Sequence, residues 1–304
     1  MAISRAQLVK ELEPGLNALF GLEYKRYDNQ HAEIYTNESS DRAFEEEVML
    51  SGFANANVKV EGSGVNYDQS QETYTARYTH DTIALAFAIT EEAIEDNLYD
   101  RISSRYTKAL ARSMSNAKQV KAAAPLNNGL PTADGFDSGD GESLFNTAHT
   151  TVSGTNVKNT LTTQADLNET SLEQALIDIA AFTDERGLRV AAKGVKMIIP
   201  SANQFSAERL LKSQGRTGTA DNDINAVASM GMVPQGYRVN NFLTDSDSWY
   251  IITDVPNGMK MFTRAPLTTA MEGDFDTGNV RYKARERYSF GVSDYRGIFG
   301  CEGA

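Results

Sequence analysis

The stretch from Thr90 to Ala124 reads TEEAIEDNLYDRISSRYTKALARSMSNAKQVKAAA; it holds no glycine or proline, and Pro125 follows at once. Apolar side chains recur in it close to the helical period, at Ile94, Leu98, Ile102, Tyr106, Leu110, Met114, Ala117 and Val120. Thr90 is a typical N-cap, and Pro125 lacks the amide hydrogen that would continue a helix. We therefore expect one amphipathic helix over residues 91–124, roughly 50 Å long at about 1.5 Å per residue.

The charges of this helix are segregated along its length. Acids fill the first third, at Glu91, Glu92, Glu95, Asp96 and Asp100, and only basic residues follow. Steps of three or four residues place four of these on one stripe that no acid of the helix opposes: Arg101, Arg105, Lys108 and Arg112. Two interpretations remain open for the stripe: a solvated face, or a contact with acids of another chain or with phosphates.

Composition excludes several classes of protein. The chain has 304 residues, enough for one large domain or two intimate ones. The single Cys301 permits no internal disulfide, and no apolar run approaches the roughly 20 residues that cross a membrane. The net charge of −12 argues against a dedicated sequence-reading nucleic-acid binder, although it does not exclude packing beside DNA.

The segment before the long helix changes from polar to strand-like. Capping-box spacing from Ser4 predicts a short helix that ends at Pro14, and residues 21–47 suggest an extended arm. Val58 and Val60 alternate with polar residues, residues 62–64 turn the chain, and residues 73–80 alternate again, so we expect a long hairpin. Its tip is polar on both faces and should rest on something outside its own fold. Residues 83–89 predict a half-buried strand that leads into the helix.

The segment after the long helix predicts a compact α+β domain. Residues 126–165 are rich in loop formers, and a capping box at residues 170–173 opens a helix that we expect to end at Gly187. A second helix should follow Ser201 and end near Gly215. Strands are expected at 195–199, 237–242, 249–253, 259–263 and 280–292. Residues 165–263 therefore mix helices and strands in one unit.

Residues with catalytic or metal-binding potential are few. His80 continues the alternation of a strand and is better explained as a hydrogen-bonded sheet residue than as a ligand. The sequence contains neither a nucleophile turn of the form G-x-S-x-G nor a phosphate-binding P-loop. Arg216 lies in a G-x-x-G run that some RNA-binding modules use for phosphates, but the acids that follow favour a mobile loop. We expect no enzyme activity, cofactor or metal, and instead a subunit that interlocks with copies of itself.

The order of arm, hairpin, long helix and α+β domain resembles the Hong Kong 97-type coat subunit, and the sequence is similar to major capsid proteins of tailed bacteriophages, close to the Mu-like head subunits. The entry to the helix carries the likeness, at residues 78–81, 87–92 and 95–99. Further segments support it, at 144–149, 198–200, 209–213, 220–223, 286–291 and 294–297. The likeness covers about residues 40–300, and its strength lies in the order of the segments.

The resemblance implies a division of the chain. It assigns residues 1–48 to the N-terminal arm, 49–82 to the E-loop over a neighbouring subunit, 83–164 to the peripheral domain with spine helix 91–124, 165–263 to the axial domain, and 264–304 to a C-terminal return. The loop around residues 215–225, which holds Arg216, would point to the capsomere axis. Arg101, Arg105, Lys108 and Arg112 would then meet acids of an adjacent subunit or packaged DNA.

The resemblance also implies partners and a location. Copies would form pentamers and hexamers of an icosahedral head around double-stranded DNA bound without sequence specificity, assembled in the bacterial cytoplasm and found in the virion, with a portal and with or without scaffold and cement proteins. Some members of the fold join subunits through a lysine–asparagine isopeptide bond; Lys59 is the only lysine near the hairpin tip, but no separate feature supports that chemistry. The alternatives are an encapsulin-like shell around enzymes and, more distantly, a soluble binding module.

Overall fold

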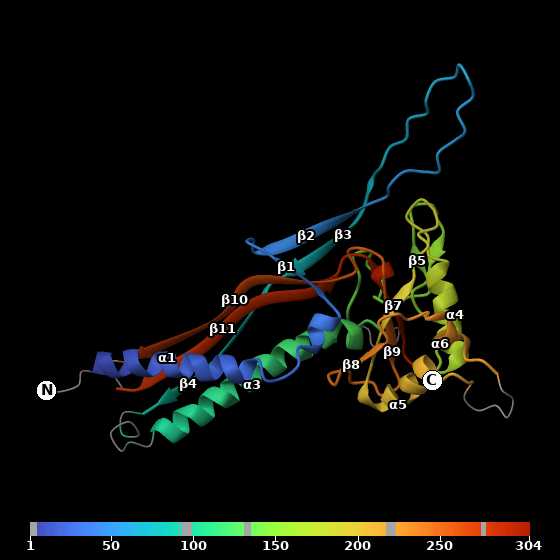
Figure 1. Ribbon diagram of the computed structural model, residues 1–304. Coiled ribbons are helices and arrows are strands. Elements are labelled where there is room, and N and C mark those ends of the chain that lie inside the picture. Colours follow the sequence, from blue (N-terminus) through green and yellow to red (C-terminus); the bar gives the residue numbers. More distant parts are fainter. Residues whose placement is uncertain (1–4, 91, 93–98, 131–134, 217–222, 275–277) are drawn as a thin grey trace.

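An elongated sheet and a smaller second sheet form the two halves of the molecule, and a hairpin projects from the first half (Figure 1). The computed structural model describes residues 5–90, 92, 99–130, 135–216, 223–274 and 278–304. The elongated sheet has the strand order β1-β10-β11-β4, and its strands are β1 (Thr36–Ser39), β10 (Met259–Gly273), β11 (Val280–Val292) and β4 (Asp81–Ile89). β11 pairs antiparallel with both β10 and β4, so it lies between two strands that are far apart in the sequence.

Two helices, α1 (Arg5–Tyr24) and α3 (Tyr99–Asn128), pack side by side against the elongated sheet. Phe20 of α1, Met114 of α3 and Tyr282 of β11 belong to one buried cluster. Burial of side chains of this size contributes about 1.5–3 kcal/mol each. Asn17 of α1 accepts hydrogen bonds from the Tyr282 hydroxyl at 2.8 Å and the Thr269 hydroxyl at 2.7 Å, which fixes the helix along the sheet.

The long helix does not end where its sequence predicted. Pro125 lies inside α3, which continues to Asn128, because Leu126 and Leu130 are buried in the main core and their packing offsets the hydrogen bond that proline cannot donate. The Tyr250 hydroxyl donates to the Leu126 carbonyl at 3.1 Å. The expected start after Thr90 falls on residues 91 and 93–98, which lie outside the described residues.

Two predictions for the N-terminal segment are also wrong. α1 continues through Pro14 to Tyr24, because its second half buries Leu16 and Phe20 against α3. Residues 21–47 are not a plain extended arm: they hold the end of α1, the short helix η1 (Gln30–Glu33), β1 and the start of β2. β1 joins the sheet edge in parallel with β10.

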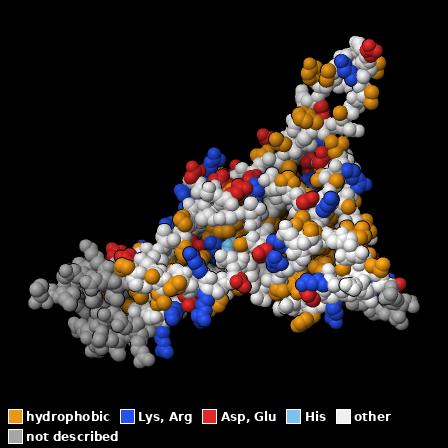
Figure 2. Space-filling view, viewed as in Figure 1, with side chains coloured by type: hydrophobic (Ala, Val, Ile, Leu, Met, Phe, Trp, Pro, Cys, Tyr) orange, Lys and Arg blue, Asp and Glu red, His pale blue; other side chains and the backbone are white. Residues whose placement is uncertain are grey.

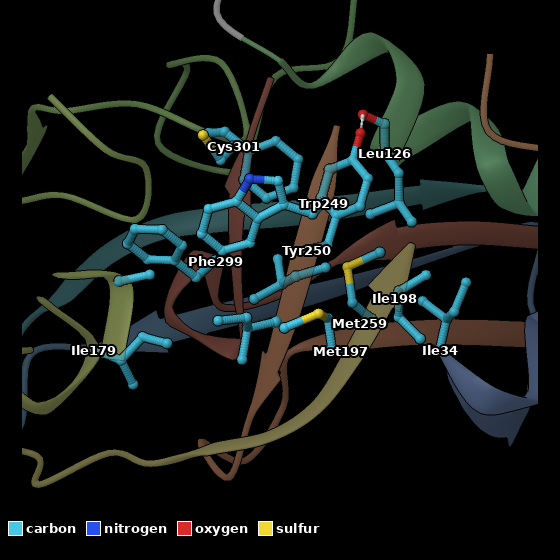
Figure 3. Packing of buried hydrophobic residues seen from close by; sticks show 14 of the residues in the cluster. Ile34, Leu126, Ile179, Met197, Ile198, Trp249, Tyr250, Met259, Phe299 and Cys301 are labelled. Atoms are coloured by element: carbon cyan, nitrogen blue, oxygen red, sulfur yellow. Dashed lines mark hydrogen bonds between the residues drawn. The ribbon is translucent and has the colours of Figure 1, made fainter. Parts of the chain in front are cut away.

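The smaller half of the molecule is built on the sheet β12-β9-β7-β8, with strands β7 (Gly194–Ile199), β8 (Tyr237–Val239), β9 (Trp249–Thr253) and β12 (Ile298–Cys301). The main hydrophobic core surrounds this sheet, with Trp249, Tyr250 and Phe299 fully buried (Figure 3). The remaining elements are β5 (His149–Thr150), β6 (Asn156–Val157), α4 (Glu169–Ala180), η2 (Ser201–Asn203), α5 (Gln204–Lys212), α6 (Ala226–Met230) and η3 (Tyr295–Gly297).

Strands of this half follow the sequence pattern more closely than its helices do. β9 has the predicted bounds, β7 begins one residue early, and β8 ends at Val239 instead of residue 242. In the elongated sheet β11 also has its predicted bounds. α4 begins after Asn168, because the Asn168 side chain accepts from the Ser171 amide at 2.9 Å and Ser171 answers in a reciprocal cap. It ends at Ala180 instead of Gly187, since Asp184 accepts hydrogen bonds from two backbone amides and forms a turn of its own.

The hairpin is formed by different residues from those predicted for its first strand. β2 (Phe44–Leu50) pairs antiparallel with β3 (Glu72–Thr79), and residues 51–71, here called the hairpin loop, extend beyond this ladder. Val58 and Val60 are in the loop and not in a strand, although Gly62 turns the chain as expected with φ of 81°. The ladder forms where its side chains pack on the rest of the molecule.

The expected limit between the axial domain and the C-terminal return falls within a strand, and the two segments share a sheet. β10 runs across residue 263 from the main core into the elongated sheet. β12, from the expected C-terminal return, completes the sheet that β7 and β9 form. Because one continuous core includes Ile34, Leu126 and Phe299, the two halves are packed as one body.

Candidate assembly surfaces

The base of the hairpin is anchored to the elongated sheet. The Tyr78 ring packs edge-on against Phe262 of β10 with 4.7 Å between ring centroids, and its hydroxyl lies 2.5 Å from Ser293 Oγ. Gly291 of β11 lies beneath this ring, where an added Cβ would be 2.6 Å from a Tyr78 ring carbon. Only glycine fits this contact, so the angle at which the hairpin leaves the body is set by packing.

A buried cation adds to the anchor. Lys260 of β10 is almost fully buried, and its Nζ lies 2.6 Å from Glu47 of β2 and 3.1 Å from Glu38 of β1. Burial alone would lower the pKa of Lys260, but the hydrogen bonds from the two carboxylates outweigh it and raise the pKa. Lys260 of β10 thus links the hairpin strand β2 and the edge strand β1 to the elongated sheet.

The hairpin loop exposes apolar side chains far from any core. Five of them are 60–97% exposed, and Figure 2 shows apolar side chains along this projection: Phe53, Val58, Val60, Val65 and Tyr67. The alternation of valines with Lys59 and Glu61 at the tip hides this apolar content in the sequence pattern, because neither face of the loop is buried in one chain. Several exposed apolar side chains on one projecting segment indicate an interaction site.

The basic stripe of α3 is only partly free. Arg105 and Lys108 are exposed and form no ion pair within the described part of the chain. Arg112 pairs with Glu23 of α1 at 3.1 Å. No acid of α3 itself opposes the stripe, as expected, but for Arg112 the partner is an acid of the same chain, on the helix packed alongside, and not one of another chain. Arg101 is in α3, but its side chain lies outside the described residues. Figure 2 shows basic side chains along this lower edge of the molecule.

The two other candidate residues lie on separate surfaces. Lys59 is exposed in the hairpin loop. Arg216 Nε lies 2.8 Å from the Glu169 carboxylate at the start of α4, and its amide donates to the Asp223 carbonyl at 2.9 Å. Residues 217–222 of the same loop are outside the described residues. The structure therefore does not bring all six candidates together: four lie on α3, Lys59 is in the hairpin loop and Arg216 is in the loop after α5.

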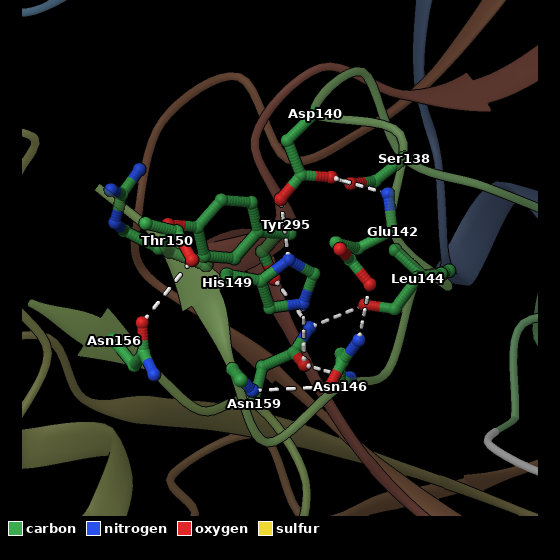
Figure 4. A network of polar contacts seen from close by, with 12 residues as sticks. Ser138, Asp140, Glu142, Leu144, Asn146, His149, Thr150, Asn156, Asn159 and Tyr295 are labelled. Atoms are coloured by element: carbon green, nitrogen blue, oxygen red, sulfur yellow. Dashed lines mark hydrogen bonds and ion pairs between the residues drawn. The ribbon is translucent and has the colours of Figure 1, made fainter. Parts of the chain in front are cut away.

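His80 and His149 form hydrogen bonds that stabilise the fold. His80 Nδ1 lies 3.0 Å from Ser289 Oγ and Nε2 lies 2.9 Å from Ser40 Oγ, as expected for a satisfied sheet residue. His149 is buried between Asp140 at 2.6 Å and Asn159 at 3.1 Å and stacks on Tyr295 (Figure 4). Asn159 also donates to the Leu144 carbonyl at 2.7 Å, so the network joins the loop before β5 to the C-terminal segment.

A buried ionic cluster lies next to this network. Arg296 is paired with Glu185 and Asp294, and its Nε donates to the Thr183 carbonyl at 2.8 Å. Burial raises the pKa of Asp294, although Arg296 opposes the shift. These groups are paired and hydrogen-bonded within the chain, so they stabilise the fold.

Sequence reasoning missed the anchors Glu47 and Lys260 and the cation Arg186, whose partners are distant in sequence. The run of three acids at Glu45, Glu46 and Glu47 was the available signal, and it was assigned to the arm. Among the described residues, no group of three or more His, Cys, Asp or Glu is arranged to hold a metal ion. None of the helices in that part of the chain is long and apolar enough to span a bilayer.

Comparison with known proteins gives one family. Residues 73–300 match a family model described as phage capsid protein. None of the curated proteins compared with the chain matches it.

Solved structures with the same fold are similar over nearly their whole length. The capsid of an empty GTA particle has a TM-score of 0.59 and 13% identity and covers 92% of this chain and 91% of its own. The capsid of Myoviridae phage XM1 has a TM-score of 0.53 and 12% identity over 89% of each chain. The virus-like particle from Pyrococcus furiosus has a TM-score of 0.53 and 12% identity over 95% of this chain and 98% of its own.

Proposed function

Because a family model matches most of its length, this chain belongs to the phage capsid protein family, and we propose that its copies assemble as pentamers and hexamers around double-stranded DNA. The chain is a major capsid protein with the Hong Kong 97-type α+β fold, a structural protein of the virion and not an enzyme. Its working form is a shell of many copies.

The hairpin loop is the observation that best supports the proposed arrangement. Its exposed apolar side chains project beyond the body (Figure 2), where none of the described residues of the same chain covers them. In a ring of copies each loop lies over a neighbouring subunit and removes this surface from water, which stabilises the ring by about 25 cal/mol per Å² of apolar area buried. The family consists of phage capsid proteins, which favours this viral shell over an encapsulin-like shell around enzymes.

The exposed cations of α3 fit the packaged DNA. Arg105 and Lys108 are exposed on the side of α3 away from the sheet and have no acid partner among the described residues. A few such cations per subunit, repeated over a shell, neutralise phosphates without reading sequence. The same residues serve equally as contacts to acids of an adjacent subunit, and portal, scaffold and cement proteins are further proposed partners.

Charge reversal separates these roles. Arg105→Glu and Lys108→Glu are made in the full chain, with Lys193→Glu on the other half of the molecule as a matched exposed control. A DNA role predicts normal shell yield with less nuclease-protected DNA, and a subunit-contact role predicts a lower yield. If both shell yield and protected DNA equal those of the wild type, the proposed role of the stripe is wrong. Native mass spectrometry of the capsomeres, with five and six copies expected, tests the pentamers and hexamers.

A further inference from the structure

Both ring nitrogens of His149 face hydrogen-bond acceptors inside the fold. The side chain has no exposed surface. Its Nδ1 lies 2.6 Å from an oxygen of the Asp140 carboxylate, and its Nε2 lies 3.1 Å from the Asn159 side-chain oxygen (Figure 4). A neutral imidazole has one donor and one acceptor, whereas the imidazolium donates from both nitrogens. Two acceptors on opposite sides of the ring therefore fit the protonated form.

The orientation of the Asn159 amide is fixed by its other partners. Its nitrogen donates to the Leu144 carbonyl at 2.7 Å and to the Tyr295 carbonyl at 3.1 Å. Its oxygen accepts from the Asn146 amide at 2.9 Å. Exchanging the two amide atoms would place oxygen against two carbonyl oxygens and nitrogen against a backbone N–H, which breaks all three bonds. The oxygen of Asn159 therefore faces the histidine, which has to donate to it.

The carboxylate on the other side of the ring is fixed as well. Asp140 also accepts from the Ser138 hydroxyl and, at 3.2 Å, from the Glu142 amide. Burial raises the pKa of Asp140, but the hydrogen bonds from His149 and Ser138 outweigh it and lower the pKa. Asp140 is therefore an acceptor on both oxygens, and the proton between the two side chains belongs to the histidine.

The charged groups beyond the ring also favour a cation at His149. The ring stacks on Tyr295 with 3.9 Å between centroids, and the Arg296 guanidinium carbon lies 4.5 Å from the centroid of the same tyrosine. Glu185 and Asp294 pair with this arginine and are buried with it. Together with the carboxylate on the histidine, three acids would face one fixed cation if His149 were neutral. The imidazolium adds a second positive charge on an aromatic face, where a cation is attracted.

Two contacts connect this histidine to the base of the hairpin. The residue before Asp140 is Gly139, and an added Cβ there would lie 2.7 Å from a ring carbon of Tyr74 in β3. The Tyr74 ring also lies beside Tyr295, with 6.3 Å between centroids. The loop of residues 137–143 and the stacked tyrosine thus support β3 from below, and His149 holds both in place.

We propose that His149 is an imidazolium in the folded chain and that its proton latches the base of the hairpin. Without this proton one ring nitrogen presents a lone pair to an acceptor oxygen, so either Asp140 or Asn159 loses its hydrogen bond and residues 137–143 loosen from Tyr74. A histidine in water loses its proton near pH 6.5, at the ordinary pKa of about 6.5. The latched state therefore binds more protons than the open state above that pH, and a rise in pH favours opening. The latch acts within one chain, and it positions the hairpin through which copies are proposed to meet.

Nitrogen-15 NMR of histidine-labelled, full-length chain tests the protonation state directly. Magic-angle spinning spectra are recorded at pH 7.5, so that soluble and assembled chains can both be measured. The single variants His31→Gln and His80→Gln each remove one set of signals and assign the remainder to His149. We expect two protonated ring nitrogens for His149; one protonated and one unprotonated nitrogen would overturn the proposal.

Asp140→Asn tests the latch, because it satisfies a neutral ring. The new amide can donate to Nδ1 while its oxygen still accepts from Ser138 and the Glu142 amide, and Nε2–H donates to Asn159. We expect His149 to have one unprotonated nitrogen in this variant. Glu142→Gln is the matched control from the same loop, since the Glu142 side chain is exposed and accepts from Asn146 and not from the ring.

Hydrogen-exchange protection factors, which correct for the intrinsic effect of pH on exchange, report the opening of the hairpin base. In the wild type and in Glu142→Gln, protection of the β3 amides should fall about tenfold or more between pH 7 and 9, because a hydrogen bond to a charged group is lost. In Asp140→Asn, protection should stay constant over this range. Wild-type protection that does not change with pH, or an Asp140→Asn profile that falls as the wild type does, would overturn the latch.

Discussion

Arg186 and Asp68 join the smaller half of the molecule to the hairpin loop: Arg186 Nη2 lies 3.1 Å from Asp68 Oδ1. Arg186 also donates to the Gln69 carbonyl at 2.9 Å, and Asp68 accepts from the Ala54 amide on the opposite side of the loop at 2.7 Å. Asp68 therefore connects both sides of the loop to a turn after α4. Hydrogen bonds that Asp68 accepts from the Ala54 and Gln69 amides, followed by the charge of Arg186, lower the pKa of Asp68.

Removal of this contact should free the loop without unfolding the body. We predict that Arg186→Ala increases hydrogen exchange and proteolytic cleavage within residues 51–71, while the thermal unfolding midpoint stays near that of the wild type, because exposed ion pairs add little to global stability. Lys212→Ala breaks the exposed pair with Glu208 and serves as a control. Unchanged exchange in the loop would mean that the contact does not hold it.

The hairpin base should tolerate no side chain at Gly291. We predict that Gly291→Ala lowers the free energy of unfolding by roughly 1–3 kcal/mol, because the new methyl group would overlap the Tyr78 ring. Gly273→Ala, at the end of β10 with open space around it, is the matched control. Urea titration measures both, and equal stability of the two variants would contradict the packing described.

Arg296 should be essential to the fold and not to any interface. We predict that Arg296→Met lowers the free energy of unfolding by about 3–5 kcal/mol, because it leaves Glu185 and Asp294 buried without their cation. Chemical denaturation measures the loss. A triple variant, Arg296→Met with Glu185→Gln and Asp294→Asn, should recover part of it; a variant with Arg296→Met alone at wild-type stability would disprove the role.

His31 should make the chain sensitive to mild acid. Burial, with the nearby Lys118 cation, lowers the pKa of His31 to about 4. The unfolded chain binds a proton at the ordinary histidine pKa of about 6.5, so between pH 6.5 and 4 the unfolded state takes up more protons and stability falls as the pH falls. The loss from this group is on the order of 3 kcal/mol at the lower end.

Urea titrations at pH 7, 5.5 and 4.5 check the prediction for His31. His31→Gln, which cannot charge, should lose less stability over this range than the wild type, and the difference between the two curves isolates the histidine. His80→Gln is a comparison, since the pKa of His80 is also lowered by burial. Parallel curves for wild type and His31→Gln would show that His31 is protonated equally in both states.

Strands and the identity of the fold were predictable from the sequence because they depend on local alternation and on the order of elements. β4, β9 and β11 follow their patterns closely, and His80 is bonded as expected. The ends of the helices were not predictable from the sequence. Pro14 and Pro125 lie inside helices that are stabilised by packing against residues distant in sequence.

The assembly surfaces were predictable only in outline. The hairpin and the stripe of α3 could be found from sequence, but the acid that answers Arg112 comes from α1, and Lys260 meets Glu47 across more than 200 residues. The alternate cations of β11, Arg281, Lys283, Arg285 and Arg287, are visible in the sequence, but only the pairing of β11 with β4 and β10 shows which side chains lie beside them. Contacts of this kind depend on tertiary structure, which local patterns do not encode.

Electron microscopy combined with light scattering on the purified full-length chain tests the central claim most directly. The account predicts icosahedral shells or capsomere rings for the wild type, and folded but unassembled chains when Val58, Val60, Val65 and Tyr67 of the hairpin loop are changed to serine. A wild-type chain that stays strictly monomeric at high concentration, with scaffold and portal proteins supplied, would contradict it.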